Sequence, residues 1–371
     1  MGKYVLKRIG YMLLVMVILS FLMFLIYNLT PSNRAYTEAK NTTTAQKQKA
    51  KGMTKDEKEK WFNNIYENYK LRYGQNGSLV LRYGRWMGIW PKYVYNEAVG
   101  DDVPWKVKVD ENGKKMFKFE GILEGEFGWS WEQKEPVIEA VVEPMKNTIF
   151  YNIFATFLAL VITIPLGIVC AVKKGSKGDQ AMQVITIIGY SLPTFIICIL
   201  FIWVFCSLLG WLPPSGMKTP GSDYHGWKWL GDRLYYLILP LSAMTFCSLG
   251  SMTRYVRASM IDALSMDCIR TARAKGVKEK IVIFSHAWRN ALIPIVTLIV
   301  GWFLGIFGGS LVFENMFGIN GMGKLMIKSL TTSDYDVVIL LQLFYVAISL
   351  VGNLIIDIVY GLVDPRVRVS E

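Results

Sequence analysis

The amino-acid sequence predicts an all-α polytopic membrane protein with six transmembrane helices. Hydrophobic residues make up 52% of the 371 residues, although the formal net charge is +12. A helix of about 20 apolar residues is long enough to cross a bilayer. Because backbone groups in lipid must be hydrogen-bonded within the protein, we expect the long apolar runs to form helices. The six runs are Ile9–Leu29, Thr148–Val172, Met182–Leu209, Leu234–Met252, Leu292–Val312 and Val337–Leu362.

The first run has an alternative interpretation as a cleaved signal peptide, because Lys3, Lys7 and Arg8 precede it. Its apolar part is too long for a signal peptide, and the following YNLTPS lacks a small-x-small cleavage site. We therefore interpret residues 1–30 as a retained N-terminal transmembrane helix.

The distribution of lysine and arginine predicts the orientation of these helices. Short cytoplasmic loops of membrane proteins are enriched in both residues. Six crossings place four basic segments on one side: the N-terminus, VKKGSKGD after the second run, residues 254–289 and the C-terminal tail. Both termini are therefore expected in the cytoplasm. This topology explains the net positive charge, and nucleic-acid binding is not expected.

Residues 31–146 are then expected outside the cytoplasm, as a small α+β domain inserted between the first two helices. Thr54 and Glu57 have the spacing of a capping box, and Trp61 and Ile65 recur at helical spacing after it. Further on, apolar and basic residues alternate on both sides of Asn112-Gly113, which favours a β-hairpin.

Residues 147–366 follow as a core of five helices, and residues 367–371 as a cytoplasmic tail. Small residues in membrane helices allow close packing, and we favour this role over gating for the glycines of the fifth run. Four prolines interrupt the core helices or lie near their starts: Pro165, Pro193, Pro240 and Pro294.

The core shows no pattern typical of a catalytic or metal site. His225 and His286 would lie on opposite sides of the membrane, so a catalytic histidine with partners is not expected. The cysteines have no disulfide or metal-binding spacing, and we interpret them as small buried apolar residues. They are Cys170, Cys198, Cys206, Cys247 and Cys268.

Acidic residues are missing from the second to the fifth apolar run. Ion-coupled and proton-coupled transporters usually carry such groups near the middle of the membrane. Glu314, at the outer end of the fifth helix, is interpreted as solvated, and Asp357 as an interfacial or helix-pairing carboxylate. The energy for transport is therefore expected to come from another protein, although a stand-alone secondary transporter remains the alternative.

The stretch FGINGMGKL resembles a phosphate-binding loop in spacing. Gly318, Gly323 and Lys324 match that motif, but Leu325 stands where Ser or Thr would hold magnesium. No strand is predicted before these residues, and the topology places them outside, away from cytoplasmic ATP. We interpret them as a glycine-rich turn that leads into a short helix, Met322–Leu330.

The basic segment between the fourth and fifth helices is too long for a passive connection. SMDCIRTARAK favours a short helix that Gly276 would end. Ala272 and Ala274 leave a surface with few bulky side chains, beside the polar Thr271 and the basic Arg273. Such a surface could dock into a groove of another protein. From the residues alone, docking to another protein and the alternative are equally well supported. The alternative is a surface loop whose basic residues only reflect its position on the cytoplasmic side.

Several stretches resemble one known family. RTARAKG followed by HAWRNALIPIVT is similar to the cytoplasmic coupling loop of permease subunits of ATP-binding-cassette importers. More narrowly, it resembles the first, B-type, permease of the dipeptide/oligopeptide family of binding-protein-dependent importers. Similar stretches recur in order along the chain: VLKRIGYMLLV, GEFGWSW, LGWLPPSG, GGSLVFENMFGINGMGKL and YGLVDPRVR. The external segment is longer than is usual in that family, mainly at residues 91–123.

This resemblance implies a type I importer permease fold in a bacterial or archaeal plasma membrane. The partners would be a second homologous permease, two ATP-binding-cassette ATPases, an extracytoplasmic peptide-binding protein and membrane lipids. ATP and magnesium would be bound by the ATPases, so this chain would need no cofactor and carry no catalytic residue. Peptides are the expected cargo, with nickel chelates or another small solute as the alternative.

The resemblance also assigns roles to two sets of residues. One set would form the short helix that couples to the ATPases: Asp267, Arg270, Thr271, Ala272, Arg273, Ala274, Lys275 and Gly276. The other set would dock the binding protein at the outer mouth of the pathway: Gly318, Gly321, Gly323 and Lys324.

Overall fold

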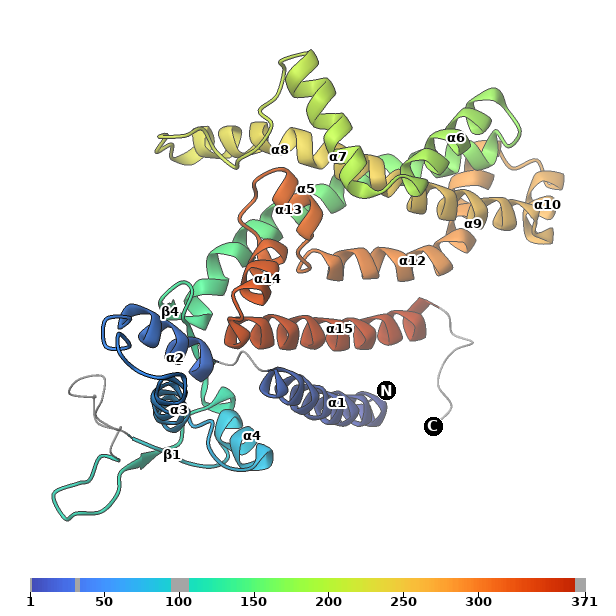
Figure 1. Cartoon of the computed structure of the whole chain (residues 1–371). Helices are drawn as coiled ribbons and strands as arrows, with labels where there is room; N and C mark the ends of the chain where they lie inside the picture. Colours follow the sequence, from blue (N-terminus) through green and yellow to red (C-terminus); the bar gives the residue numbers. More distant parts are fainter. Residues whose placement is uncertain (1, 31–33, 95–106, 364–371) are drawn as a thin grey trace. The chain divides into compact units, whose positions relative to one another are not determined.

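The computed structural model describes residues 2–30, 34–94 and 107–363, and these are mostly helical (Figure 1). The chain divides into two compact units. Unit one comprises residues 1–141 and 326–344, and unit two comprises residues 142–325 and 345–371. Each unit is described separately, and the helices α5, α14 and α15 contribute residues to both.

Besides its parts of α5, α14 and α15, the described portion of unit one contains four helices and four very short strands. Its helices are α1 (Gly2–Leu29), α2 (Arg34–Ala45), α3 (Lys55–Arg72) and α4 (Leu79–Met87). Two antiparallel pairs are formed by β1 (Lys92–Tyr93) with β2 (Phe117–Lys118), and by β3 (Trp129–Ser130) with β4 (Glu135–Pro136). A single 3₁₀ turn, η1 (Ile122–Glu124), lies between β2 and β3.

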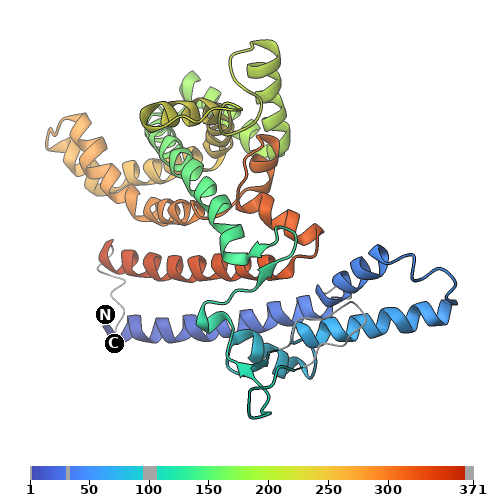
Figure 2. The ribbon, with the colours of Figure 1, turned by 90° about the vertical axis from the view of Figure 1, so that its left-hand side faces the viewer.

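Aromatic side chains pack the helices of unit one together. The ring of Tyr83 on α4 lies edge-on to Phe21 of α1 at 5.1 Å, and its hydroxyl is 2.7 Å from Oγ of Ser20. On the other side of the unit, α2 and α3 run alongside each other (Figure 2), where the Tyr36 ring lies 5.4 Å from that of Phe62. The unit therefore has its own small aromatic core.

Two local predictions for this region are confirmed. The Thr54 backbone N–H donates to the Glu57 carboxylate at 2.7 Å, and Thr54 Oγ1 accepts from the Glu57 N–H, as in a capping box. Val109 and Lys115 form an antiparallel bridge around the turn that contains Asn112. The part of the predicted hairpin before residue 107 lies outside the described residues.

Unit two holds most of the predicted core. It contains α5 (Val137–Val172), α6 (Lys177–Ser191), α7 (Thr194–Ile202), α8 (Gly226–Ser248), α9 (Arg254–Ser265) and α10 (Asp267–Ala274). These are followed by α11 (Glu279–Ile281), α12 (Trp288–Gly305), α13 (Leu311–Met316), α14 (Met322–Thr331) and α15 (Tyr335–Val363). Three π-helical turns continue or precede these helices: η2 (Trp203–Leu208), η3 (Leu249–Thr253) and η4 (Val282–Ala287).

Four stretches of the described chain are long and apolar enough to cross a membrane, and two bent helix pairs raise the total to six. The four candidates are the apolar stretch that starts at Val5 in α1, then Val137–Val172, Gly226–Ser265 and Tyr335–Val359. The bent candidates are Lys177–Ser191 with Thr194–Leu208, and Glu279–Leu292 with Pro294–Gly305. The number of crossings thus matches the prediction when each bent pair is one span.

The third predicted helix, Met182–Leu209, is not a single straight helix. The chain turns by 107° between α6 and α7. Pro193 causes this break, because a proline lacks an amide hydrogen and disfavours helical geometry in the residue before it. Leu192 accordingly has the extended dihedral angles φ −77° and ψ 135°.

The fifth predicted helix also differs from the structure. It bends by 65° at Pro294 and ends at Gly305, so the prediction that it continues to Val312 is wrong. After this end, the chain approaches another part of itself so closely that a Cβ atom at Gly309 would overlap the backbone of Gly323. A straight helix through this position would not allow that approach.

Unit two has two hydrophobic clusters, one beneath each of the two predicted sites. The first includes Met260, Ile269 and Val282, and the second includes Tyr151 and Phe317. The cysteines follow the prediction only in part. Cys170 and Cys198 are buried and Cys206 and Cys247 are half-buried, whereas Cys268 is exposed on α10.

Candidate functional site

The predicted coupling helix exists as α10, an eight-residue helix between α9 and α11. Its inner face is apolar: Ile269 is fully buried and Ala272 is 8% exposed. Both belong to the cluster that contains Met260 of α9 and Val282 of η4. Burial of this face fixes α10 on its own chain, because removing apolar area from water is the main source of packing energy.

The C-terminal end of α10 has the geometry that the sequence predicts. Gly276 has a φ of +72°, in the left-handed region that favours glycine. The N–H of Val277 donates to the carbonyl of Ala272 at 3.2 Å, and the N–H of Gly276 donates to that of Arg273 at 2.9 Å. These bonds satisfy carbonyls that the end of a helix leaves without partners.

Most of the predicted coupling residues lie on the outer face of this helix or at its end. Ala272 is the exception, because it faces the hydrophobic cluster, and its assignment to the ATPase-coupling set stays a prediction. The exposed ones are Asp267, Arg270, Thr271, Arg273, Ala274, Lys275 and Gly276.

The charged side chains of α10 form ion pairs that remain exposed on its surface. Arg273 forms two hydrogen bonds with the Glu279 carboxylate, at 3.1 and 2.6 Å, and this pairing raises the pKa of Arg273. Nη1 of Arg270 lies 3.3 Å from Oδ1 of Asp267, and both side chains are exposed. Exposed ion pairs contribute little to stability because water and salt screen them, so these pairs orient the surface more than they stabilise it.

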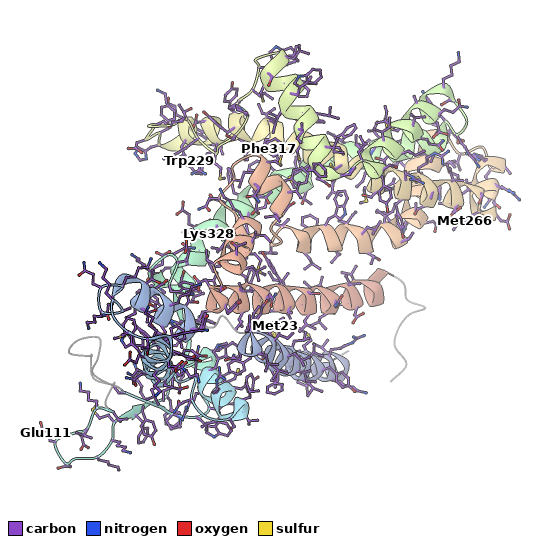
Figure 3. All side chains as sticks on the ribbon, in the orientation of Figure 1. Met23, Glu111, Trp229, Met266, Phe317 and Lys328 are labelled. Carbon is purple, nitrogen blue, oxygen red and sulfur yellow. The ribbon has the colours of Figure 1, made fainter. Side chains whose placement is uncertain are left out.

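Two residues of this surface were missed by sequence reasoning. Met266, which precedes α10 (Figure 3), is 44% exposed, and Cys268 is exposed one turn before Ala272. The inner face could have been recognised, because Ile269 and Ala272 are three positions apart, on the same side of a helix. These exposed groups make the surface of α10 partly apolar as well as basic.

A buried ion pair holds α9 against α6 near the coupling helix. Arg257 contacts Asp179 through Nε at 2.6 Å and through Nη2 at 2.8 Å. The same carboxylate accepts the N–H of Gly175 at 2.9 Å, and its side chain is fully buried. Breaking such a pair leaves an uncompensated buried charge, which costs about 3–5 kcal/mol. No local pattern in the sequence indicates this pairing.

The second predicted site, the glycine-rich turn, surrounds the carboxylate of Glu314. This side chain is fully buried, so the prediction that it is a solvated helix end is wrong. Its Oε1 accepts hydrogen bonds from Tyr151 Oη at 2.9 Å and Thr148 Oγ1 at 3.1 Å, and its Oε2 accepts from the N–H of Lys324 at 2.7 Å. Three donors therefore satisfy the carboxylate.

The same face of α5 provides further bonds to this region. Asn152 Nδ2 donates to the carbonyls of Ile306 at 3.0 Å and Gly308 at 2.9 Å, just after α12 ends. Asn147 Nδ2 donates to the carbonyl of Asn320 at 2.9 Å. The polar residues of NTIFYN thus tie both the end of the fifth helix and the glycine-rich turn to α5.

Close packing and backbone geometry explain the glycines of this turn, including the two that match a phosphate-binding loop, Gly318 and Gly323. A Cβ atom at Gly321 would overlap the Glu314 carboxyl group, and one at Gly323 would lie 2.7 Å from the amide nitrogen of Leu311. Gly318 has a φ of +64° at the turn itself. The short helix predicted after this turn is confirmed as α14, which begins at Met322.

The predicted docking residues differ in their accessibility. Gly321 and Gly323 are buried, whereas Gly318 is exposed and Lys324 is half-buried. The docking role of these four residues stays a prediction. In the part of the chain that the structure describes, no group of three or more acidic, histidine or cysteine side chains is placed to hold a metal ion.

Comparison with known proteins places these features in context. Residues 163–369 match the family model described as binding-protein-dependent transport system inner membrane component. The oligopeptide transport system permease protein AppB of Bacillus subtilis is 38% identical over 248 residues, which are 67% of this chain and 77% of AppB. The permease OppB of Haemophilus influenzae is 31% identical over 257 residues, 69% of this chain and 80% of OppB.

A comparison of structures gives a weaker likeness. A chain from inward-facing conformations of the MetNI methionine ABC transporter is similar with a TM-score of 0.46 and 18% sequence identity. The alignment covers 60% of this chain and 97% of that one.

Proposed function

Because this chain belongs to the family of inner membrane components of binding-protein-dependent transport systems, we propose that it is the permease subunit of an ATP-driven oligopeptide importer. It would form half of the translocation pathway. The peptide cargo is supported by two relatives named for oligopeptide transport, each of which aligns with about two thirds of this chain.

The observation that carries the coupling role is the two-sided character of α10. Ile269 anchors the helix to the protein interior, while Arg270, Thr271 and Ala274 lie exposed on the other side. A helix with one apolar face and one polar face is anchored to its own chain and still accessible to a partner. This arrangement supports a contact between α10 and a cytoplasmic ATPase.

The remaining subunits follow from this assignment. A second homologous permease would complete the pathway, and two ATP-binding-cassette ATPases would bind ATP and magnesium. An extracytoplasmic peptide-binding protein would deliver the cargo. This chain would then hold no cofactor and contribute no catalytic residue to ATP hydrolysis.

The packing around α10 suggests how its movement would reach the membrane helices. Ile269 shares a hydrophobic cluster with Met260 of α9 and Ile295 of α12. Since close-packed interiors shift as rigid pieces and do not deform smoothly, displacement of α10 would carry α9 and α12 with it. The importer would have two arrangements of its subunits. ATP would shift the equilibrium toward the arrangement whose ATPases bind it more tightly.

The proposed topology places α10 and both termini in the cytoplasm. Residues 31–146 and the glycine-rich turn would then be extracytoplasmic. Gly318 and Lys324 would lie where a peptide-binding protein approaches, on a turn that the Glu314 carboxylate holds in place through the backbone of Lys324. A turn fixed in this way suits docking because little order has to be gained on binding.

The coupling role is tested by reversing one charge at the end of α10 in the reconstituted importer. Lys275 and Lys174 are both exposed lysines and both are expected in the cytoplasm, but only Lys275 adjoins α10. We expect Lys275→Glu to lower ATP-dependent peptide uptake about tenfold, within the range typical of coupling between two sites. Lys174→Glu serves as the matched control and should leave uptake unchanged. Equal uptake by both variants would contradict the coupling assignment.

The cargo is tested separately in the same proteoliposomes. Uptake of a labelled oligopeptide should be reduced by unlabelled peptides and not by nickel chelates. If nickel chelates compete and peptides do not, the peptide assignment is wrong, whereas the effect of Lys275→Glu would still support the coupling role.

A further inference from the structure

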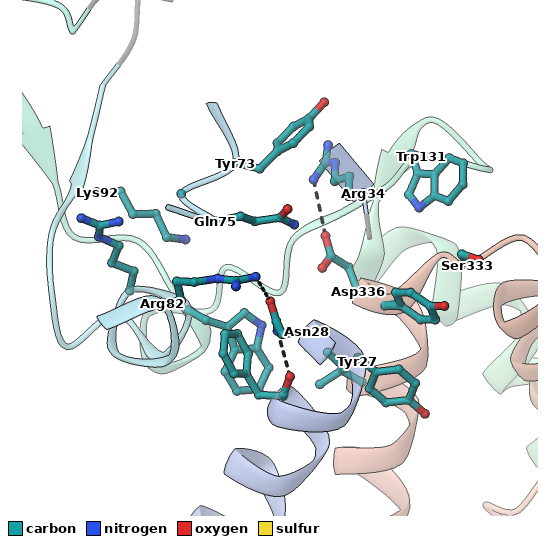
Figure 4. Close-up of a pocket in the computed structure, with 16 residues that line it drawn as sticks. Tyr27, Asn28, Arg34, Tyr73, Gln75, Arg82, Lys92, Trp131, Ser333 and Asp336 are labelled. Carbon is teal, nitrogen blue, oxygen red and sulfur yellow. Dashed lines mark hydrogen bonds and ion pairs between the residues drawn. The ribbon is translucent and has the colours of Figure 1, made fainter. Parts of the chain in front are cut away.

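Unit one contains a basic pocket that the transport function does not use. Its cavity has a volume of about 100 Å³ and lies where α1 ends and α15 begins (Figure 4). Four cationic side chains line it, together with one carboxylate, that of Asp336. The cations come from α2, α4 and β1: Arg34, Arg82, Arg85 and Lys92.

The cations of this pocket have few anionic partners. Arg82 donates to the side-chain oxygen of Asn28, and Arg85 donates to that of Asn76 at 2.9 Å, so both partners are neutral. The distance from Nη1 of Arg34 to Oδ2 of Asp336 is 3.4 Å, which is long for a hydrogen bond. Among the residues that the structure describes, the buried Nε atoms of Arg34 and Arg82 have no hydrogen-bond partner. Because Arg82 pairs with a neutral side chain and Arg34 with a carboxylate at 3.4 Å, an anion could take up the remaining donors of both guanidinium groups.

Burial makes this excess of positive charge costly. Burial lowers the pKa of Lys92, against the opposing effects of Glu120 and Asp336. A buried charge without a full counter-charge costs free energy that a bound anion would recover. Arginine is suited to this task, because its planar group of donors can bind a phosphate or carboxylate through two hydrogen bonds.

The position of the pocket indicates the source of the anion. Tyr27 and Asn28 lie in the last turn of the apolar helix α1, and Tyr335 and Asp336 lie in the first turn of α15, another span candidate. The pocket therefore lies at the edge of the apolar layer, where aromatic residues gather and lipid headgroups lie. Trp86 and Trp131 line it as well.

We propose that the basic pocket of unit one binds the phosphate group of an anionic phospholipid. The cavity volume of about 100 Å³ is several times the roughly 10–15 Å³ that one water molecule needs by the same measure, so a phosphate group has room there. Basic pockets beside membrane helices recognise acidic headgroups in this way. The inference is independent of the cargo and of the coupling helix.

The test compares lipid retention by the full-length protein in nanodiscs of equal parts phosphatidylglycerol and phosphatidylcholine. Native mass spectrometry should show phosphatidylglycerol retained in preference to phosphatidylcholine. The double variant Arg82→Gln/Lys92→Gln should lose about tenfold in this preference, because two charged donors are removed. The matched control is Lys58→Gln/Lys60→Gln, which removes two exposed charges from α3 of the same unit and should behave as the wild type.

A second measurement separates the lipid from free phosphate and does not depend on folding of the variant. Thermal unfolding of the wild type in detergent is followed with added phosphatidylglycerol or with inorganic phosphate. Stabilisation by phosphatidylglycerol alone supports the lipid headgroup, and equal stabilisation by both supports the phosphate site with a free anion as ligand. No lipid preference in the wild type, or the same preference in both double variants, would overturn the proposal.

Discussion

At the scale of single residues, Glu314 determines the conformation of the turn that follows it. Thr148 and Tyr151 lie about one turn apart on α5, and both hydroxyls donate to the same carboxylate oxygen. The polar residues of α5 were visible in the sequence. Their partner was not, because the bond from Thr148 to Glu314 joins positions 166 residues apart, and local patterns carry no information about such pairing.

Replacing Glu314 tests this role directly. Glu314→Ala strands the hydroxyls of Thr148 and Tyr151 and the N–H of Lys324, and each buried unpaired donor costs about 1–3 kcal/mol. We therefore expect a loss of several degrees in the unfolding temperature of the detergent-purified protein. Glu314→Gln keeps one carbonyl acceptor, so its unfolding temperature should lie between those of the wild type and Glu314→Ala.

The control for this experiment is the neighbouring residue. Asn315 is exposed on the same short helix, so Asn315→Ala should leave the unfolding temperature unchanged. An unfolding temperature for Glu314→Ala equal to that of the wild type would show that the buried carboxylate does not stabilise the turn.

At the scale of elements, the sequence predicted short helices better than long ones. The helices α10 and α14 occur where the sequence places them, because a glycine marks the end of one and precedes the other. Long apolar runs predicted the course and the ends of helices less well. Prolines 193 and 294 bend their runs, and hydropathy counts apolar residues without regard to the direction of the chain.

The end of α10 offers a test of an element as a unit. No atom lies within 4 Å of a Cβ atom built at Gly276, so only its positive φ disfavours a side chain there. Left-handed backbone costs other residues about 1–2 kcal/mol, least for asparagine. Gly276→Val should therefore weaken the end of α10 and lower ATP-dependent uptake severalfold, whereas Gly276→Asn should keep most of it.

A glycine of the same region serves as the control for this pair of variants. Gly178 lies in α6 with ordinary helical geometry and only a distant contact, so Gly178→Val should leave uptake unchanged. If Gly276→Val transports as well as Gly276→Asn, the conformation of this end is not required for coupling.

At the scale of the whole molecule, composition and charge predicted a membrane protein, and the six predicted crossings match the candidate spans if each bent helix pair is one span. Composition and charge could not predict which helix faces pack together, because lipid and protein interior are about equally apolar. The buried ion pair of Asp179 and Arg257 illustrates the difficulty, since both residues look like ordinary charges beside apolar runs. Charge counts alone would leave them on the cytoplasmic surface.

The proposed location of α10 in the cytoplasm, in contact with the ATPases, can be measured directly through Cys268. It is exposed on α10, whereas the other four cysteines are buried or half-buried. A membrane-impermeant maleimide is applied to inverted and to right-side-out vesicles, with and without the ATPase subunits. Cys268→Ser identifies the labelled thiol.

The proposed function predicts labelling of Cys268 in inverted vesicles only, and a marked loss of that labelling once the ATPases are assembled. Labelling in right-side-out vesicles would place α10 on the wrong side of the membrane. Equal labelling with and without the ATPases would contradict its role as the coupling helix.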